Sequence, residues 1–454
     1  MVCGSAATVG IGLGGMNGIA VALVATVAGV VLLAHLFAPS EWRDQPPPPG
    51  KDERGFLAGL VFKAFLLRTL VSLALHATDG WQYFGGDEGT FDGTARVFSL
   101  WVKGELPFNL SAPLASKAEV AYPYLLGALY YTFGWSKVVP LLLNAVVGAS
   151  LVYPVHALAG RFAGREAARR AATLVAWFPS LVLWSALMVR DAWVLLFLIS
   201  ALYLVDRARR KLTAANLLGV GLCLAGIATT RNYVFSVVAV AIAAGLVLGR
   251  GSTARSLFLG SLSIVGLIAL LRSGGDSGLD SPRATLEAIA LQRNLNSMGP
   301  SVSGSLGLVD ISTPTAALTY LPLGLLFFLF SPLPWQIRST MQVAAIADLL
   351  LWYSLMPAIL AGLVWLVRKR LRAALPLLLA VVGISVLYAL VEGNIGIIFR
   401  HRAQIIVPLC AVAGVGYALK RRAARKESRL LERPLPVHAP PVGPLRPAPG
   451  VRVP

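Results

Sequence analysis

Residues 85–96 read Gly-Gly-Asp-Glu-Gly-Thr-Phe-Asp-Gly-Thr-Ala-Arg, in a polar segment that directly follows a long apolar run. Its three carboxylates stand out in a chain that is 13% charged and 56% hydrophobic. A helix starting at Asp87 would place Glu88, Asp92 and Arg96 on one face, because residues four apart are neighbours along a helix. The simplest interpretation is that Asp87 caps this helix and that Asp92 pairs with Arg96. A further role for Asp87 and Glu88 depends on where the segment lies.

Apolar runs on both sides of this segment determine the fold class. A bilayer core about 30 Å thick needs roughly 20 apolar residues per helix. Such runs recur along the 454 residues, so we predict an all-α polytopic membrane protein with about 11–12 transmembrane helices. The runs cover residues 15–37, 55–77, 138–159, 171–188, 193–205, 214–229, 234–248, 257–271, 316–330, 345–367, 374–391 and 403–419.

The distribution of charge predicts the orientation in the membrane. The formal net charge of +19 is concentrated in short loops and the C-terminal tail, which is typical of the cytoplasmic side and does not indicate nucleic-acid binding. The polar loop 78–120 then lies outside. An outer N-terminus and an inner tail require an odd number of spans, so one run between 257 and 367 should fail to cross. We favour the run that ends near Trp335. The predicted location is the plasma (inner) membrane.

Three regions follow from this pattern. Residues 1–54 form an N-terminal span and linker, and residues 55–419 form the transmembrane domain. That domain includes the outer loop 78–120 and a second polar stretch at 272–312. The Tyr-rich run 122–134 is too short to span and suits an interfacial helix in the first large outer loop. Residues 420–454 form a basic, Pro-rich tail that should be disordered in the cytoplasm. The three cysteines are too scattered for a disulfide framework.

Most of the unusual polar residues fall at outer span ends in this topology. Solvated loop charges explain any one of them, but together they suggest an outer cavity. Arginine suits the binding of a phosphate oxygen pair, so a lipid phosphate would fit such a cavity. Arg68 belongs to the second apolar run and could snorkel toward the same surface. The other members that matter below are Asp87, Glu88, Arg190, Asp191, Arg231, Arg400 and Arg402.

These motifs resemble a known family of enzymes. Asp87-Glu88 followed by Ala95-Arg96 is similar to the Asp-Glu-x-x-Tyr-x-x-x-Ala-Arg pattern of the aminoarabinose transferases and their glycosyltransferase family 39 relatives, with Phe91 in place of the tyrosine. The protein O-mannosyltransferases are among those relatives, within the GT-C superfamily of membrane glycosyltransferases. The segments that resemble later family motifs are the run 122–134, residues 179–191, and residues 399–402 with Pro408.

The resemblance implies an inverting glycosyltransferase that moves a hexosyl or pentosyl group at the extracytoplasmic face. The donor would be a polyprenyl-phosphate-linked sugar, and the acceptor hydroxyl would belong to a lipid, a glycan or a protein. Asp87 is the candidate catalytic base, with Glu88 second. Candidates for donor-phosphate binding are Arg400, Arg402, Arg68 and Arg231, and Arg190 with Asp191 forms a second acidic turn. Some GT-C enzymes use a divalent metal, for which Asp87 and Asp191 could supply oxygen ligands.

Two other functions remain open from the sequence. A transporter or lipid flippase would also need buried charge, although transporters usually place it near midspan in broken helices of two related halves. A polysaccharide polymerase or ligase also uses arginines and lipid-linked sugars, and the polar stretch 272–312 suits its late outer loop.

Overall fold

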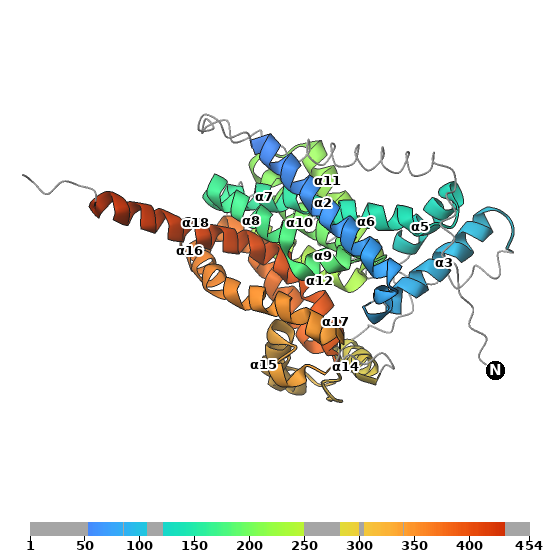
Figure 1. Cartoon of the computed structure of the whole chain (residues 1–454). Helices are drawn as coiled ribbons and strands as arrows, with labels where there is room; N and C mark the ends of the chain where they lie inside the picture. The colour runs from blue at the N-terminus through green and yellow to red at the C-terminus, as the bar shows by residue number, and fades with distance from the viewer. Residues whose placement is uncertain are drawn as a thin grey trace, which may run out of the picture.

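The computed structural model describes residues 53–84, 86–106, 121–248, 282–298, 304–338 and 340–431. Regular structure within these ranges is helical apart from one isolated bridge between Ser305 and Asn394. Figure 1 shows the helices as a bundle. They are α2 (Glu53–Ala77), η2 (Gly80–Tyr83), α3 (Gly86–Val102), α5 (Ala121–Phe133), α6 (Val138–Ser150), α7 (Val152–Ala163), α8 (Arg165–Trp177), α9 (Pro179–Ala186), α10 (Asp191–Arg210), α11 (Ala214–Thr230), α12 (Asn232–Leu248), α14 (Pro282–Met298), α15 (Pro314–Phe330), η3 (Pro334–Gln336), α16 (Thr340–Val391), α17 (Ile395–His401) and α18 (Ala403–Leu431).

The apolar helices confirm the predicted class of all-α membrane protein. Four segments in the described part of the chain are long and apolar enough to cross a membrane, namely Glu53–Ala77, Val138–Ala163, Ala345–Val391 and Ala403–Ala424. Three shorter apolar helices accompany them: Ala214–Thr230, Asn232–Gly245 and Pro314–Phe330. The predicted runs 15–37 and 257–271 lie outside the described residues, as do almost all of region 1–54, residues 107–120 of the loop 78–120, and residues 272–281 and 299–303 of the polar stretch 272–312.

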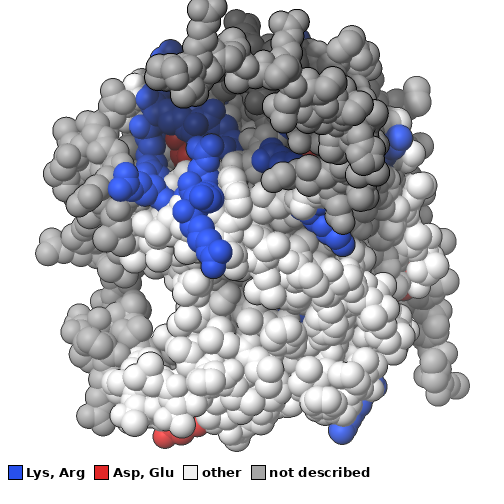
Figure 2. Space-filling view, turned by 90° about the vertical axis from the view of Figure 1, so that its left-hand side faces the viewer, with Lys and Arg blue, Asp and Glu red and all other residues white. Residues whose placement is uncertain are grey.

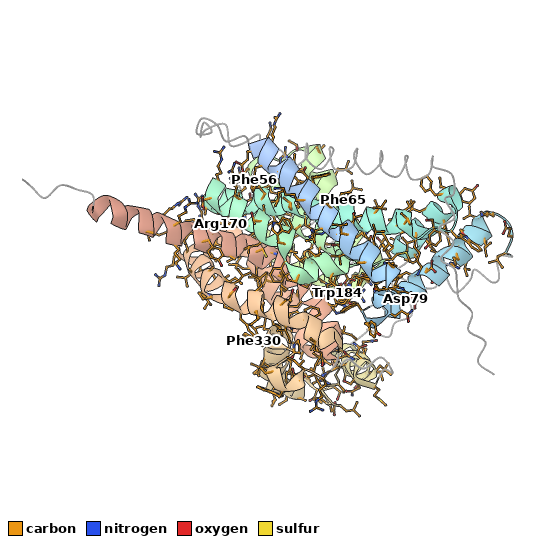
Figure 3. All side chains as sticks on the ribbon, viewed as in Figure 1. Phe56, Phe65, Asp79, Arg170, Trp184 and Phe330 are labelled. Atoms are coloured by element: carbon orange, nitrogen blue, oxygen red, sulfur yellow. The ribbon has the colours of Figure 1, made fainter. Side chains whose placement is uncertain are left out.

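Helix α18 packs closely against both α8 and α16. Glycines allow this close approach. A Cβ at Gly414 would strike the backbone of α8 at Ala167, and one at Gly416 would strike the backbone of α16 at Ala358. Small residues let membrane helices come close enough for extensive van der Waals contact. Figure 3 shows the side chains that fill the space between these helices.

Three predicted boundaries need correction. The run 171–188 is not one helix, because Phe178 has extended backbone (ψ 122°) and separates α8 from α9. Pro179 follows it and disfavours a helical conformation at the preceding residue. The runs 345–367 and 374–391 join in one element, α16, with non-helical backbone at Arg370. Helix α18 continues to Leu431, so the tail predicted to be disordered from 420 begins as helix, and residues 432–454 lie outside the described part.

Helices α3 and α5 form a separate pair at one end of the bundle, at the right of Figure 1. The helix predicted for the run 122–134 is present as α5, and Gly134 follows its last residue with a φ of 79° that suits glycine. Tyr122, Leu126 and Tyr130 of α5 are buried against Ala95 of α3. This packing fixes the first turn of α3, which carries Asp87 and Glu88, against the bundle.

Candidate active site

The first turn of α3 presents two carboxylates in different directions. The structure starts this helix at Gly86, within one residue of the prediction, and the positive end of the helix dipole favours acidic residues there. Consecutive helical residues point about 100° apart. The side chain of Asp87 is 55% exposed, whereas that of Glu88 is fully buried. The two neighbours therefore have different environments and should have different roles.

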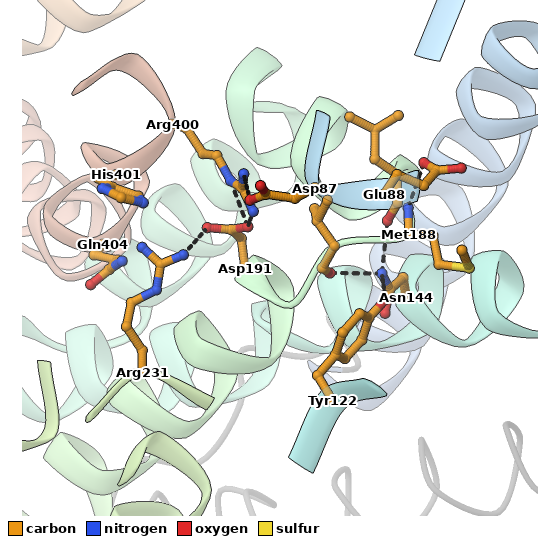
Figure 4. A network of polar contacts seen from close by, with 12 residues as sticks. Asp87, Glu88, Tyr122, Asn144, Met188, Asp191, Arg231, Arg400, His401 and Gln404 are labelled. Carbon is orange, nitrogen blue, oxygen red and sulfur yellow. Dashed lines mark hydrogen bonds and ion pairs between the residues drawn. The ribbon is translucent and has the colours of Figure 1, made fainter. Parts of the chain in front are cut away.

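Asp87 lies against Arg400 of α17, far away in the sequence. Arg400 Nη1 donates to Asp87 Oδ2 at 2.6 Å, and Arg400 Nε donates to Asp191 Oδ2 at 2.7 Å. Nη2 of the same guanidinium also contacts Asp191. Figure 4 shows Arg400 between the two carboxylates. Asp191 begins α10 and is 3% exposed, so the guanidinium joins a buried carboxylate to a half-exposed one.

The network continues from Asp191 into the protein. Arg231 Nη2 donates to Asp191 Oδ1 at 3.2 Å, and its Nη1 donates to the Tyr388 hydroxyl at 3.3 Å. Gln404 Nε2 donates to the same hydroxyl at 2.7 Å. Burial alone would raise the pKa of the Asp191 carboxyl, but the charges of Arg400 and Arg231 hold that pKa below its ordinary value. Asp191 is therefore an anchored carboxylate that orients both arginines.

Glu88 holds together three segments that surround the site. Its Oε1 accepts from His76 Nε2 at 2.8 Å and lies 3.5 Å from Lys137 Nζ, and its Oε2 accepts from the Met188 backbone N–H at 3.1 Å. Burial would raise the pKa of Glu88, yet the contact with His76 and the other bonds lower it overall. Glu88 thus acts as a positioning residue for the loop that leads to Asp191.

Glu88→Gln should lower stability more than Asp87→Asn does. The glutamine loses charge-assisted bonds inside the protein, which costs roughly 1.5–3 kcal/mol. Asp87 is half-exposed, so its change should cost about 1 kcal/mol or less. Thermal unfolding of both variants in the same detergent measures the difference. Equal melting temperatures would contradict the anchoring role of Glu88.

Asn144 of α6 supports the same loop and was not expected from the sequence. Its Nδ2 donates to the carbonyls of Leu187 and Val189 at 2.7 and 2.9 Å, and its Oδ1 accepts from Trp193 Nε1 at 2.9 Å. Nδ2 also donates to the Tyr122 hydroxyl at 2.9 Å. A polar side chain within the apolar run 138–159 is a signal that could have found it, because polar groups are costly there.

Residues 117–272 match the family model described as dolichyl-phosphate-mannose-protein mannosyltransferase. The match confirms the resemblance to family 39 membrane glycosyltransferases. It includes Arg190, Asp191, Arg231 and Asn144 and leaves out Asp87, Glu88 and Arg400.

One solved structure similar to this chain is the archaeal oligosaccharyltransferase AglB from Archaeoglobus fulgidus, in complex with an inhibitory peptide and a dolichol-phosphate. The identity is 17% and the TM-score 0.43, with 70% of this chain and 44% of that chain covered. The present chain thus matches less than half the length of that protein. No curated protein matches it.

Arg68 and Arg402, two of the four arginines predicted to bind the donor phosphate, do not lie against Asp87. Arg68 is fully buried, and its donors reach the carbonyls of Val175 and Ala176 at 3.2 and 2.9 Å and the Ser185 hydroxyl at 2.9 Å. These carbonyls belong to the last turn of α8, where the break before Pro179 removes their helical partners. Arg402 is also fully buried and donates to the carbonyls of Phe328 and Ser331. Neither guanidinium faces Asp87.

Arg190 and the predicted pair of Asp92 and Arg96 complete the surroundings. The Arg190 guanidinium lies 5.7 Å from the centroid of the Phe91 ring, a distance that suits a cation–π contact. Arg96 Nη2 lies 3.0 Å from Asp92 Oδ2, which confirms the predicted ion pair. The Tyr130 hydroxyl also donates to Asp92 at 2.6 Å, so Asp92 supports the packing of α3 on α5.

A divalent metal does not fit between Asp87 and Asp191 as the structure places them. The guanidinium of Arg400 lies between the two carboxylates and occupies the position that a metal ion bound by both would need. Among the described residues, no group of three or more His, Cys, Asp or Glu side chains is arranged to hold a metal ion. In this arrangement the Arg400 guanidinium bridges Asp87 and Asp191.

Glu392 and His401 form a buried neutral pair behind Arg400. Glu392 Oε1 and His401 Nδ1 are 2.8 Å apart. Burial raises the pKa of Glu392 to about 8, and burial with the nearby Arg231 and Arg400 charges lowers the pKa of His401 well below its ordinary value. Near pH 7 the carboxyl group is therefore protonated and the imidazole is uncharged.

Stability should fall as the pH rises from about 6.5 to about 8. In that window the folded state keeps a proton on Glu392 that the unfolded state has released, so the stability gained from this group is lost as pH rises through its folded pKa. Below about pH 6.5 His401 has the opposite effect on stability. The unfolded state binds a proton there that the folded state does not, so stability rises with pH. Melting temperatures across the window for the wild type and Glu392→Gln check this, and an equal slope in both would contradict it.

Proposed function

We propose that this protein is an inverting glycosyltransferase that uses a polyprenyl-phosphate-linked hexose or pentose. The acceptor is a hydroxyl of a lipid, a glycan or a protein, and transfer occurs at the extracytoplasmic face of the plasma (inner) membrane. The family match over residues 117–272 supports transfer from a lipid-phosphate donor. The observation that carries the proposal is the half-exposed carboxylate of Asp87 on a guanidinium fixed from behind by Asp191.

The proposed reaction is a single displacement. The acceptor oxygen forms a bond to the anomeric carbon as the bond from that carbon to the phosphate oxygen breaks, and the anomeric configuration inverts. Asp87 takes the acceptor proton as general base. The carrier phosphate leaves with the electron pair of the broken bond. Phosphate is a weak base, so it needs charge stabilisation by Arg400 more than a proton.

Asp87 can act as the base while Arg400 stabilises the leaving phosphate, because Asp191 holds the Arg400 guanidinium in place. Asp191 binds Nε and Nη2 of Arg400, so only Nη1 bonds to Asp87. A donor phosphate that reaches Nη1 competes with Asp87 for the two N–H donors of this nitrogen while Asp191 keeps the guanidinium in its orientation. Donor binding then frees the Asp87 carboxylate to accept a proton. Arg231 keeps Asp191 charged throughout, because its bond to Oδ1 is independent of Arg400.

Transfer is tested by incubating the purified full chain with a radiolabelled polyprenyl-phosphate sugar and a panel of lipid, glycan and peptide acceptors. Release of carrier phosphate together with label in one acceptor class is the expected result, and NMR of the product reads its anomeric configuration. Retained configuration would contradict the single displacement. Label that crosses a sealed vesicle without release of phosphate would favour the transport alternative.

The membrane face of the site has its own test. Gly93 of α3 is exposed, and a Cβ there meets nothing within 4 Å, so Gly93→Cys should be tolerated. A membrane-impermeant thiol reagent should label this variant in intact cells. Ser428→Cys in the basic tail serves as the control and should react only after the cells are opened. The reverse pattern would contradict the extracytoplasmic assignment.

A further inference from the structure

A basic cavity lies at the opposite end of the bundle from Asp87. Helix α2 links the two ends, since Glu53 at its start contacts Arg165 and Arg169, and His76 at its end contacts Glu88. At 1.5 Å per residue these two contacts are about 35 Å apart along the helix. The cavity of about 620 Å³ is formed by the end of α7, the start of α8, the bend of α16 and α18. Figure 2 looks onto this end and shows blue side chains around a hollow.

The lining carries an excess of positive charge. Six arginines line the cavity with one acid, Glu166. Two further carboxylates lie behind the lining: Glu53, which pairs with Arg165 and Arg169, and Asp206, which pairs with Arg161. Six guanidinium groups thus meet three carboxylates, of which Glu166 and Asp206 also pair with Arg170 and Arg210, so at least three positive charges stay unbalanced. Arg370 is exposed, and the described part of the chain gives it no acidic partner. The arginines are Arg161, Arg165, Arg169, Arg370, Arg421 and Arg422.

The backbone keeps these guanidinium groups gathered. Arg370 is the residue at which α16 bends, with φ −140° and ψ 23°, so it projects from the bend toward the cavity. Arg422 Nη2 donates to the carbonyl of Ala163 at 2.7 Å, which holds α18 against the end of α7. Gly164 follows with φ 86° and opens space beside Arg422. A preorganised set of arginines is well suited to bind phosphate oxygens.

Two grooves continue from the cavity, and the one beside Trp365 is mostly apolar. Trp365 lines both the basic cavity and a groove of about 490 Å³ that includes Leu360, Val364 and Leu419. Leu360 and Val364 are 60% and 50% exposed on helices long enough to cross a membrane, so hydrocarbon should cover them. A second groove of about 490 Å³ shares Glu166, Arg169 and Arg421 with the cavity and adds Arg170, Thr173, Leu174 and Tyr417, so it extends the basic surface. A soluble anion would make no use of the exposed Leu360 and Val364.

We infer that this end of the protein binds an anionic phospholipid, with its phosphate headgroup in the arginine cavity and its hydrocarbon chains along the apolar groove beside Trp365. Basic pockets between membrane helices are suited to such headgroups. The basic end is the one that the positive-inside pattern assigns to the cytoplasm, where anionic lipids attract positive charge. The site is separate from the proposed sugar-transfer site and does not depend on it.

Native mass spectrometry of the full chain tests this inference. The protein is released from detergent that contains equal amounts of phosphatidylglycerol and phosphatidylcholine with the same chains. We expect phosphatidylglycerol to be retained with roughly tenfold preference. The pair Arg370→Gln with Arg422→Gln should reduce the preference to near parity. The matched control pair, Arg372→Gln with Lys211→Gln, removes the same charge from exposed positions outside the cavity lining and should leave the preference unchanged.

Two further measurements separate a lipid site from a general anion site. Val364→Trp fills the groove without altering charge, so it should weaken phosphatidylglycerol retention several-fold and leave the binding of inorganic pyrophosphate unchanged. Pyrophosphate that binds as tightly as the lipid, together with no effect of Val364→Trp, would overturn the assignment. An equal loss of phosphatidylglycerol preference in the cavity pair and in the control pair would overturn the assignment as well. Melting temperatures near that of the wild type confirm that each variant is folded.

Discussion

Asp87→Asn is expected to lower the rate of sugar transfer by roughly 10²–10⁴-fold, the usual contribution of a positioned general base. Asparagine keeps the size and the exposed position of the side chain but cannot take the acceptor proton. It also leaves Arg400 anchored, because Asp191 holds that guanidinium independently. Donor binding should therefore persist while turnover is lost. The measurement is release of carrier phosphate under single-turnover conditions.

Asp92→Asn is the matched control for this prediction. Asp92 lies in the same helix, yet it pairs with Arg96 and accepts from Tyr130 instead of contacting Arg400. Its loss should affect packing between α3 and α5 and leave the chemical step within a few-fold of the wild type. If Asp87→Asn and wild type release carrier phosphate equally, Asp87 is not the base.

Arg400→Lys is expected to lower kcat/KM by about 10²-fold, the usual cost of removing one preorganised donor from a developing anion. A lysine ammonium is a single point charge and cannot bind Asp191 and Asp87 with the fork geometry of a guanidinium. The donor phosphate would therefore lose the fixed donor that Nη1 provides. The loss should fall on both donor affinity and turnover.

Arg400→Gln should in addition destabilise the protein by roughly 3–5 kcal/mol, because it leaves the buried Asp191 with only one of its two cations. Thermal unfolding of the lysine and glutamine variants separates the two effects. Arg96→Lys, in the exposed pair with Asp92, should cost less than about 1 kcal/mol and serves as the control. A glutamine variant with wild-type melting temperature and wild-type kinetics would refute the role of Arg400.

The sequence was sufficient to predict the membrane helices and part of the site. Apolar periodicity located α2, α11 and α12 within about two residues, and the charge pattern placed Asp87, Asp191, Arg231 and Arg400 at one end of the bundle. The structure brings these four residues into one network. The roles of Asp87 and the arginines in catalysis stay predictions until they are measured.

Arg68 shows where sequence reasoning fails. Its position in an apolar helix indicated a costly charge that should reach water or a ligand. Its actual partners are the carbonyls of Val175 and Ala176, which the break at Phe178 leaves without helical donors. The residue pattern of one helix does not show which backbone carbonyls of a distant helix lack hydrogen-bond donors. Arg402 is similar, because its carbonyl partners, Phe328 in the last turn of α15 and Ser331 just after it, are brought near only by the fold.

Helix α2 has a mechanical consequence that reaches beyond either of its ends. An α-helix has a fixed rise per residue, so α2 keeps its two ends at a set separation. Glu53 is bound by Arg165 and Arg169 at one end, and His76 bonds to Glu88, next to Asp87, at the other. A displacement of those arginines along the axis of α2 should therefore move His76 and, through Glu88, the first turn of α3.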